Sequence, residues 1–156
     1  MKNHKILFAA VVLAACTSSP VTKLSAQEID LLSFAIGHYD IFDNNSAMDF
    51  RFEYRPDSKV FIENLKPWAG AEITSDTSVW VGTGLLYDFK LSDNFFLTPS
   101  FGAGFYTKGS SDKDLDFPIQ FRSQLEVSYQ FENNSRLGLG ISHMSNANLG
   151  TTNPGT

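Results

Sequence analysis

A histidine and a serine stand two positions apart in the last stretch of the sequence, GISHMSNANLGTTNPGT. A histidine side chain can take up a proton near neutral pH, and a serine hydroxyl that gives its proton to histidine can attack an ester carbonyl. Residues two apart on a β-strand share one face, so a strand here would bring His143 and Ser145 together. The spacing therefore places a proton acceptor and a hydroxyl side by side on one face of a strand. The same residues also suit the plain end of a strand, where a hydrophilic loop begins.

The elements that would position this pair are strands. Residues 117–131 place apolar side chains on one face and polar ones on the other in strict alternation, which is typical of a strand and too regular for a helix. Turn-forming residues separate the strands, and no helix start or stop signals lie between them, which favours an antiparallel meander. The same alternation, in places weaker, predicts six further strands at 32–38, 48–54, 65–73, 79–89, 95–105 and 137–143.

Such a meander fits two kinds of barrel. A soluble lipocalin-like barrel has its apolar face inside, whereas an outer-membrane barrel turns that face toward lipid and fills its interior with polar residues. The strands are long enough to cross a bilayer when tilted, and aromatic residues recur near their ends. The polar face mixes charges of both signs at Asp49, Arg51, Glu53 and Arg55. We therefore predict an all-β, antiparallel outer-membrane barrel.

The strand count and direction locate the histidine. Bacterial outer-membrane barrels have an even number of strands, so seven strands lead us to expect an eighth, C-terminal strand that this sequence lacks. If the first strand starts in the periplasm, the seventh runs outward, and His143 lies near the outer leaflet. His143 and Ser145 continue the row of Leu137, Leu139 and Ile141, so both should face lipid.

The N-terminus resembles a secretory signal. Lys2 and Lys5 precede a short apolar run, which is too short to span a bilayer. Cleavage is expected either before Cys16, in the lipoprotein-like LAAC, or after Ala26 in LSAQ. We therefore divide the chain into a signal peptide at 1–26 and one barrel domain at 27–156. Cys16 is the only cysteine, so no disulfide is expected.

Composition and the remaining motifs narrow the function classes. The formal charge is −5 with no basic cluster, which argues against nucleic acid as a partner. His38 has no cysteine or carboxylate cluster at metal-ligand spacing, and the glycines of FGAGF precede no phosphate-binding helix. Those glycines are expected to relieve crowding in a narrow barrel. We predict no metal and no cofactor.

The stretch HMSNANLGTTNPG resembles the signature of the lipid A 3-O-deacylase (PagL-like) family. The resemblance implies an eight-stranded outer-membrane barrel whose substrate is lipid A, the lipid part of lipopolysaccharide, and which removes an ester-linked 3-hydroxyacyl chain by Ser-His-Glu catalysis. It makes Ser145 the nucleophile and His143 the general base, with Asn146 stabilising the oxyanion. A second oxyanion donor in the family is a glycine amide, and Asn148 occupies that position here.

The resemblance also implies a glutamate two positions after the Asn-Pro-Gly turn, which would be position 157, one beyond Thr156. The acid, the eighth strand and an aromatic C-terminal residue are all absent from the sequence, and truncation would account for the three together. In that case the triad would lack its acid, and an inactive copy is one alternative. A non-catalytic structural or adhesive barrel, a soluble periplasmic ligand-binding barrel and a naturally truncated paralogue remain alternatives. Outer-membrane lipids are expected as surroundings, and a homodimer is left open.

Overall fold

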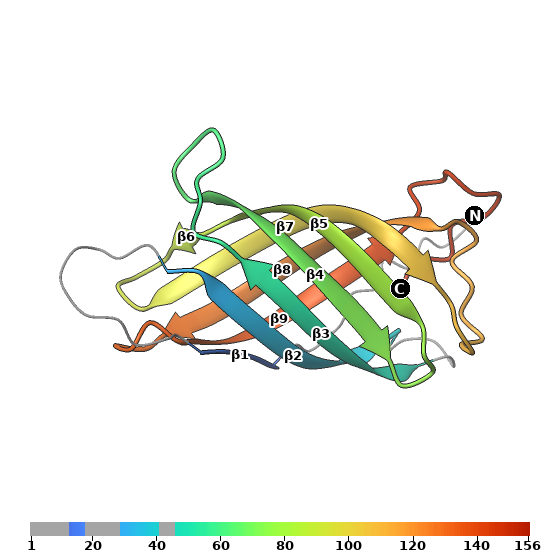
Figure 1. Cartoon of the computed structure of the whole chain (residues 1–156), viewed down its shortest axis with the longest axis horizontal. Coiled ribbons are helices and arrows are strands. Elements are labelled where there is room, and N and C mark those ends of the chain that lie inside the picture. Colours follow the sequence, from blue (N-terminus) through green and yellow to red (C-terminus); the bar gives the residue numbers. More distant parts are fainter. Residues whose placement is uncertain (1–12, 18–28, 41–45) are drawn as a thin grey trace, which may run out of the picture.

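The computed structural model describes residues 13–17, 29–40 and 46–156, which form strands joined by turns and loops. No helix in these residues is long and apolar enough to cross a membrane. Figure 1 shows the strands wrapped at a tilt around one elongated barrel. The strands are β1 (Leu13–Thr17), β2 (Leu31–Tyr39), β3 (Ala47–Arg55), β4 (Leu65–Thr74), β5 (Val79–Tyr87), β6 (Phe89–Lys90), β7 (Phe95–Thr107), β8 (Ile119–Gln130) and β9 (Arg136–Ser145).

The strands pair antiparallel in a closed ring. From β2 to β5 each strand pairs with the next, β5 pairs with β7, and β7 continues through β8 to β9. The short β6 pairs with β7 and prolongs β5 beyond Asp88, so the two count as one strand of the barrel. All seven strands expected from the alternation are present, and the prediction of an all-β antiparallel barrel is confirmed.

The eighth place in the ring is taken by β1. It lies between β2 and β9, with register from Leu13↔Ile36 to Thr17↔Leu32 on one side and with Ala14↔Gly138 and Ala15↔Leu137 on the other. This strand belongs to the segment predicted as a signal peptide, most of which lies outside the described residues. Cleavage before Cys16 or after Ala26 stays a prediction. Either cut would remove most or all of β1 and leave the edges of β2 and β9 open to another strand.

The side chains are arranged as in a membrane barrel. Phenylalanines at 34, 50, 52, 101 and 105 on the outer face are 41–71% exposed, whereas Asp49, Arg51, Glu53 and Arg55 inside are at most 6% exposed. A soluble barrel would have the opposite arrangement, because exposed apolar surface in water opposes folding. The exterior is therefore suited to lipid and the interior to polar contacts, as expected for the outer-membrane type of barrel.

The interior is filled by an ion-pair network. Arg51 lies 2.7 Å from Asp49 and 2.8 Å from Glu72, and Arg55 lies 2.9 Å from Glu126. Arg122 forms ion pairs with Glu53 and Glu72. Buried charges need this pairing, since an unpaired one would carry a large desolvation penalty.

Two tryptophans fill the rest of the mid-section. Arg122 stacks 4.5 Å from the Trp68 ring and 4.7 Å from the Trp80 ring. A Cβ atom at Gly102 would lie 2.5 Å from Trp68, and one at Gly104 would lie 2.6 Å from Trp80. The glycines of FGAGF therefore make room for the indole rings inside a narrow barrel, which confirms the expectation for them.

Candidate active site

His143 and Ser145 lie on the outward face at the end of β9. They continue the row of Leu137, Leu139 and Ile141, and both side chains are half-buried. Across the neighbouring strand β8, His143 is opposite Ser123 and Ser145 is opposite Phe121. The strand therefore places both residues of the predicted pair on the apolar wall, with no hydrogen bond between them in the described structure. Such bonds are often long in unliganded sites and tighten when substrate binds.

The imidazole of His143 is held by the segment after β9. Its Nδ1 lies 2.7 Å from the carbonyl oxygen of Thr156, and the Thr156 N–H donates to the carbonyl of Met144 at 3.0 Å. A carbonyl can only accept a hydrogen bond, so Nδ1 carries a proton, and in the neutral imidazole the free electron pair is then on Nε2. Nε2 is therefore the atom that can act as a base.

Gly155 allows this segment to fold back against the strand. Its backbone has a φ of 64°, in the left-handed region that favours glycine. A Cβ atom at this position would lie only 3.0 Å from Cε1 of His143. The Asn-Pro-Gly turn thus brings Thr156 to the imidazole, and a larger residue at position 155 would require the imidazole to shift.

Asn146 is fully buried directly after β9 and uses its side chain within the loop. Its Nδ2 donates to the carbonyls of Leu115 at 3.0 Å and Thr152 at 2.7 Å. Its Oδ1 accepts from the N–H of Asn148 at 2.8 Å, and its own N–H donates to Asn153 Oδ1 at 3.1 Å. The two donors expected to stabilise an oxyanion, the Asn146 amide and the Asn148 N–H, therefore already have partners. The oxyanion role of Asn146 stays a prediction and would require exchange of one partner for the substrate.

The loop between β7 and β8 clamps the segment after β9, and both lie at the right-hand end of the barrel in Figure 1. Asp116 Oδ2 accepts from the N–H of Thr152 at 2.6 Å, close to where a Cβ atom at Gly150 would lie. The Asp116 N–H in turn donates to Asp114 at 2.9 Å. That bond, with a weaker contribution from Lys108, lowers the pKa of the Asp114 carboxyl.

Three residues near the pair were not singled out from the sequence. Leu115 and Asp116 reach the site through a contact between two loops, and no local pattern signals such a contact. Ser123 did carry a signal, because it is the single small hydroxyl in the otherwise apolar outward row of 117–131. His38, on the outward face of β2, donates a hydrogen bond from Nδ1 to the Ala47 carbonyl at 2.9 Å.

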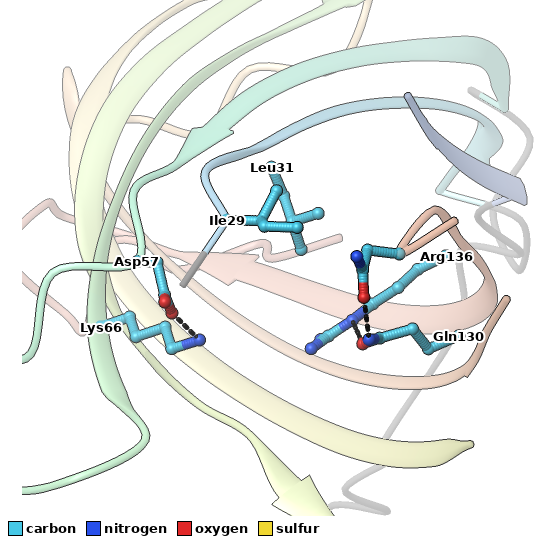
Figure 2. Close-up of a pocket in the computed structure, with 7 residues that line it drawn as sticks. Ile29, Leu31, Asp57, Lys66, Gln130 and Arg136 are labelled. Atoms are coloured by element: carbon cyan, nitrogen blue, oxygen red, sulfur yellow. Dashed lines mark hydrogen bonds and ion pairs between the residues drawn. The ribbon is translucent and has the colours of Figure 1, made fainter. Parts of the chain in front are cut away.

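The opposite end of the barrel contains a polar pocket of about 110 Å³. Figure 2 shows Lys66 paired with Asp57 on one side of this pocket and Arg136 paired with Gln130 on the other. Arg136 also lies 3.0 Å from Asp88. These charges neutralise one another, and the lining residues include no serine or cysteine that could act as a nucleophile. Its lining is Ile29, Leu31, Asp57, Lys66, Gln130, Asn134 and Arg136.

Similarity to known proteins identifies the family of this chain. Residues 51–156 match the family described as lipid A 3-O-deacylase (PagL). The chain is also 25% identical over 170 aligned positions to the lipid A deacylase PagL of Bordetella bronchiseptica, an alignment covering 99% of this chain and 92% of that protein. No solved structure matches the chain. Because the family match covers more than half of the chain and includes the whole His143–Thr156 segment, the protein belongs to the lipid A 3-O-deacylase (PagL) family.

Proposed function

We propose that this protein is an outer-membrane esterase that removes an ester-linked 3-hydroxyacyl chain from lipid A. The observation that carries the proposal is a histidine, held through Nδ1 by the Thr156 carbonyl, that shares one outward row with a serine on the apolar wall of the barrel. Placing polar side chains against lipid costs free energy, so residues of this kind usually have a function. Family membership and the printed name of the Bordetella relative support lipid A as the substrate.

Ser145 and His143 carry out the chemistry. The Ser145 Oγ attacks the acyl carbonyl while Nε2 of His143 takes the hydroxyl proton, and the carbonyl electron pair moves onto oxygen. The tetrahedral intermediate expels the sugar alcohol, which receives the proton from His143. Water then attacks the acyl-enzyme, again through His143, and releases the 3-hydroxy fatty acid.

The Thr156 carbonyl orients His143 for this role. It fixes the proton on Nδ1, which is the function of the acid in a catalytic triad. The acid that the family resemblance implies stays a prediction.

The location on the outer wall suits the substrate. The acyl chains of lipid A lie in the bilayer, against the outward side chains Ile141, Leu139 and Phe121. The ester can therefore reach Ser145 without leaving the membrane, and the barrel interior, filled with paired charges, takes no part.

The proposal is tested by mass spectrometry of lipid A from cells that produce the protein. We expect lipid A to lose the mass of one 3-hydroxyacyl chain with the wild-type protein and to stay intact with Ser145→Ala or His143→Ala. Ser92→Ala is a matched control, because Ser92 lies in the exposed turn between β6 and β7, at the end of the barrel opposite the pair. Folding of each variant is checked by heat-modifiable migration on a gel. Full deacylation by a folded Ser145→Ala variant would refute the assignment.

A further inference from the structure

The outward face of β8 contains one small hydroxyl that the mechanism above does not use. Ser123 is exposed, and among the described residues its hydroxyl has no hydrogen-bond partner. The outward Thr83 of β5 differs, because its Oγ1 donates to the Trp68 carbonyl at 2.6 Å. The neighbours of Ser123 along the same row are Ile119, Phe121, Leu125 and Val127.

Strand register places Ser123 beside the proposed catalytic pair. It is directly opposite His143, and Ser145 is one step along the diagonal. Side chains directly opposite in an antiparallel pair have Cβ atoms about 4.5–5.5 Å apart. Ser123, His143 and Ser145 therefore form one polar patch on the apolar wall. The described outward faces of β8 and β9 contain no charged side chain.

On an apolar wall, the water molecule that hydrolyses the acyl-enzyme needs a polar side chain to hold it in place. The second half of the reaction requires one water molecule near His143, whereas the surrounding side chains offer it no hydrogen bonds. A serine hydroxyl can both donate and accept, so it can hold a water molecule while His143 Nε2 takes a proton from it. The hydroxyl opposite His143 is in the right place for this.

We propose that Ser123 is a positioning residue that holds the hydrolytic water for the acyl-enzyme. In this step the water oxygen forms a bond to the acyl carbon and its proton moves to His143 Nε2. The bond between that carbon and Ser145 Oγ then breaks, and Oγ takes the proton from His143. Ser123 acts only through hydrogen bonding to the water, and the inference rests on the proposed function.

The test separates the two halves of the reaction in the purified full-length protein with lipid A. For Ser123→Ala we expect kcat to fall roughly tenfold, the value of about one hydrogen bond, with kcat/KM unchanged because formation of the acyl-enzyme is not affected. Intact-protein mass spectrometry should then show the acyl group accumulating on Ser145. Ser123→Thr keeps a hydroxyl and should restore turnover. Thr83→Val, an outward hydroxyl away from the pair, should match wild type.

Three outcomes would overturn the inference. Wild-type turnover in Ser123→Ala would show that the hydroxyl is not needed. Slower turnover without an accumulated acyl-enzyme would show that Ser123 acts on the first step or on folding. In both cases the proposed function stands, because the wild-type protein still deacylates lipid A. Intact lipid A with the wild-type protein would instead refute the proposed function, and the role of Ser123 with it.

Discussion

Replacing Asn146 by aspartate distinguishes the two roles open to this residue. The change is nearly isosteric but replaces the amide NH₂, which donates to the Leu115 and Thr152 carbonyls at 3.0 and 2.7 Å, by an oxygen. Two donated bonds are lost, and two carbonyls face an acceptor in a fully buried position. The lost bond to exposed Thr152 is worth about 1 kcal/mol, and leaving the carbonyl of buried Leu115 unsatisfied costs about 1–3 kcal/mol.

We therefore expect the loop after β9 to be destabilised by about 2–4 kcal/mol, which corresponds to roughly 30- to 1,000-fold more frequent opening. Hydrogen exchange reports such local opening. The amides to follow are those of Leu149, which donates to the Asn146 carbonyl at 3.0 Å, and Thr152, which donates to Asp116 at 2.6 Å. Measurement at pH 8 keeps the new carboxyl ionised.

Asn153→Asp provides the matched control, because it adds the same charge to the same loop and keeps an oxygen to accept from the Asn146 N–H. Its amides should exchange as in wild type. If Asn146→Asp leaves the exchange of Leu149 and Thr152 within threefold of wild type but abolishes deacylation, our structural reading of Asn146 is refuted. Asn146 would then act directly on the oxyanion.

Two further substitutions test other parts of the structure. Gly155→Ala should displace the Thr156 carbonyl from His143, because it adds a Cβ atom 3.0 Å from Cε1 of the imidazole at a φ of 64°. Deacylation should fall about tenfold while the stability of the barrel stays unchanged. Wild-type activity in this variant would contradict the expectation. Arg122→Met should lower the free energy of unfolding in lipid vesicles by about 2–4 kcal/mol, because it leaves Glu53 and Glu72 with one arginine partner each. Urea titration measures this free energy. A difference from wild type below about 1 kcal/mol would contradict the expectation.

The sequence was sufficient to predict most of the barrel because the alternation has a single period. Residues 117–131 form β8 almost as expected, and the charges of residues 49–55 point inward as the membrane alternative required. The placement of β1 could not be predicted, because LAACT has no alternation and its pairing with β2 and β9 joins residues distant in sequence. A short apolar segment fits a leader and an unpaired sheet edge equally well.

The site was predictable only where its residues share a strand. His143 and Ser145 belong to one period-two row, so their common face followed from spacing. The partners of Asn146 come from a loop about thirty residues earlier, at Leu115, and from Thr152 beyond the turn. Ser123 needed the register between β8 and β9, which a sequence pattern does not specify.

The most direct test of a reactive serine on the outer wall is covalent labelling. A fluorophosphonate reacts with serines whose hydroxyl is activated by a neighbouring base, and peptide mass spectrometry locates the adduct. Our account predicts one major adduct, on Ser145, that disappears in His143→Ala. An adduct on Ser123 or another serine, or equal labelling of Ser145 with and without His143, would contradict the proposed pairing of this nucleophile with this base.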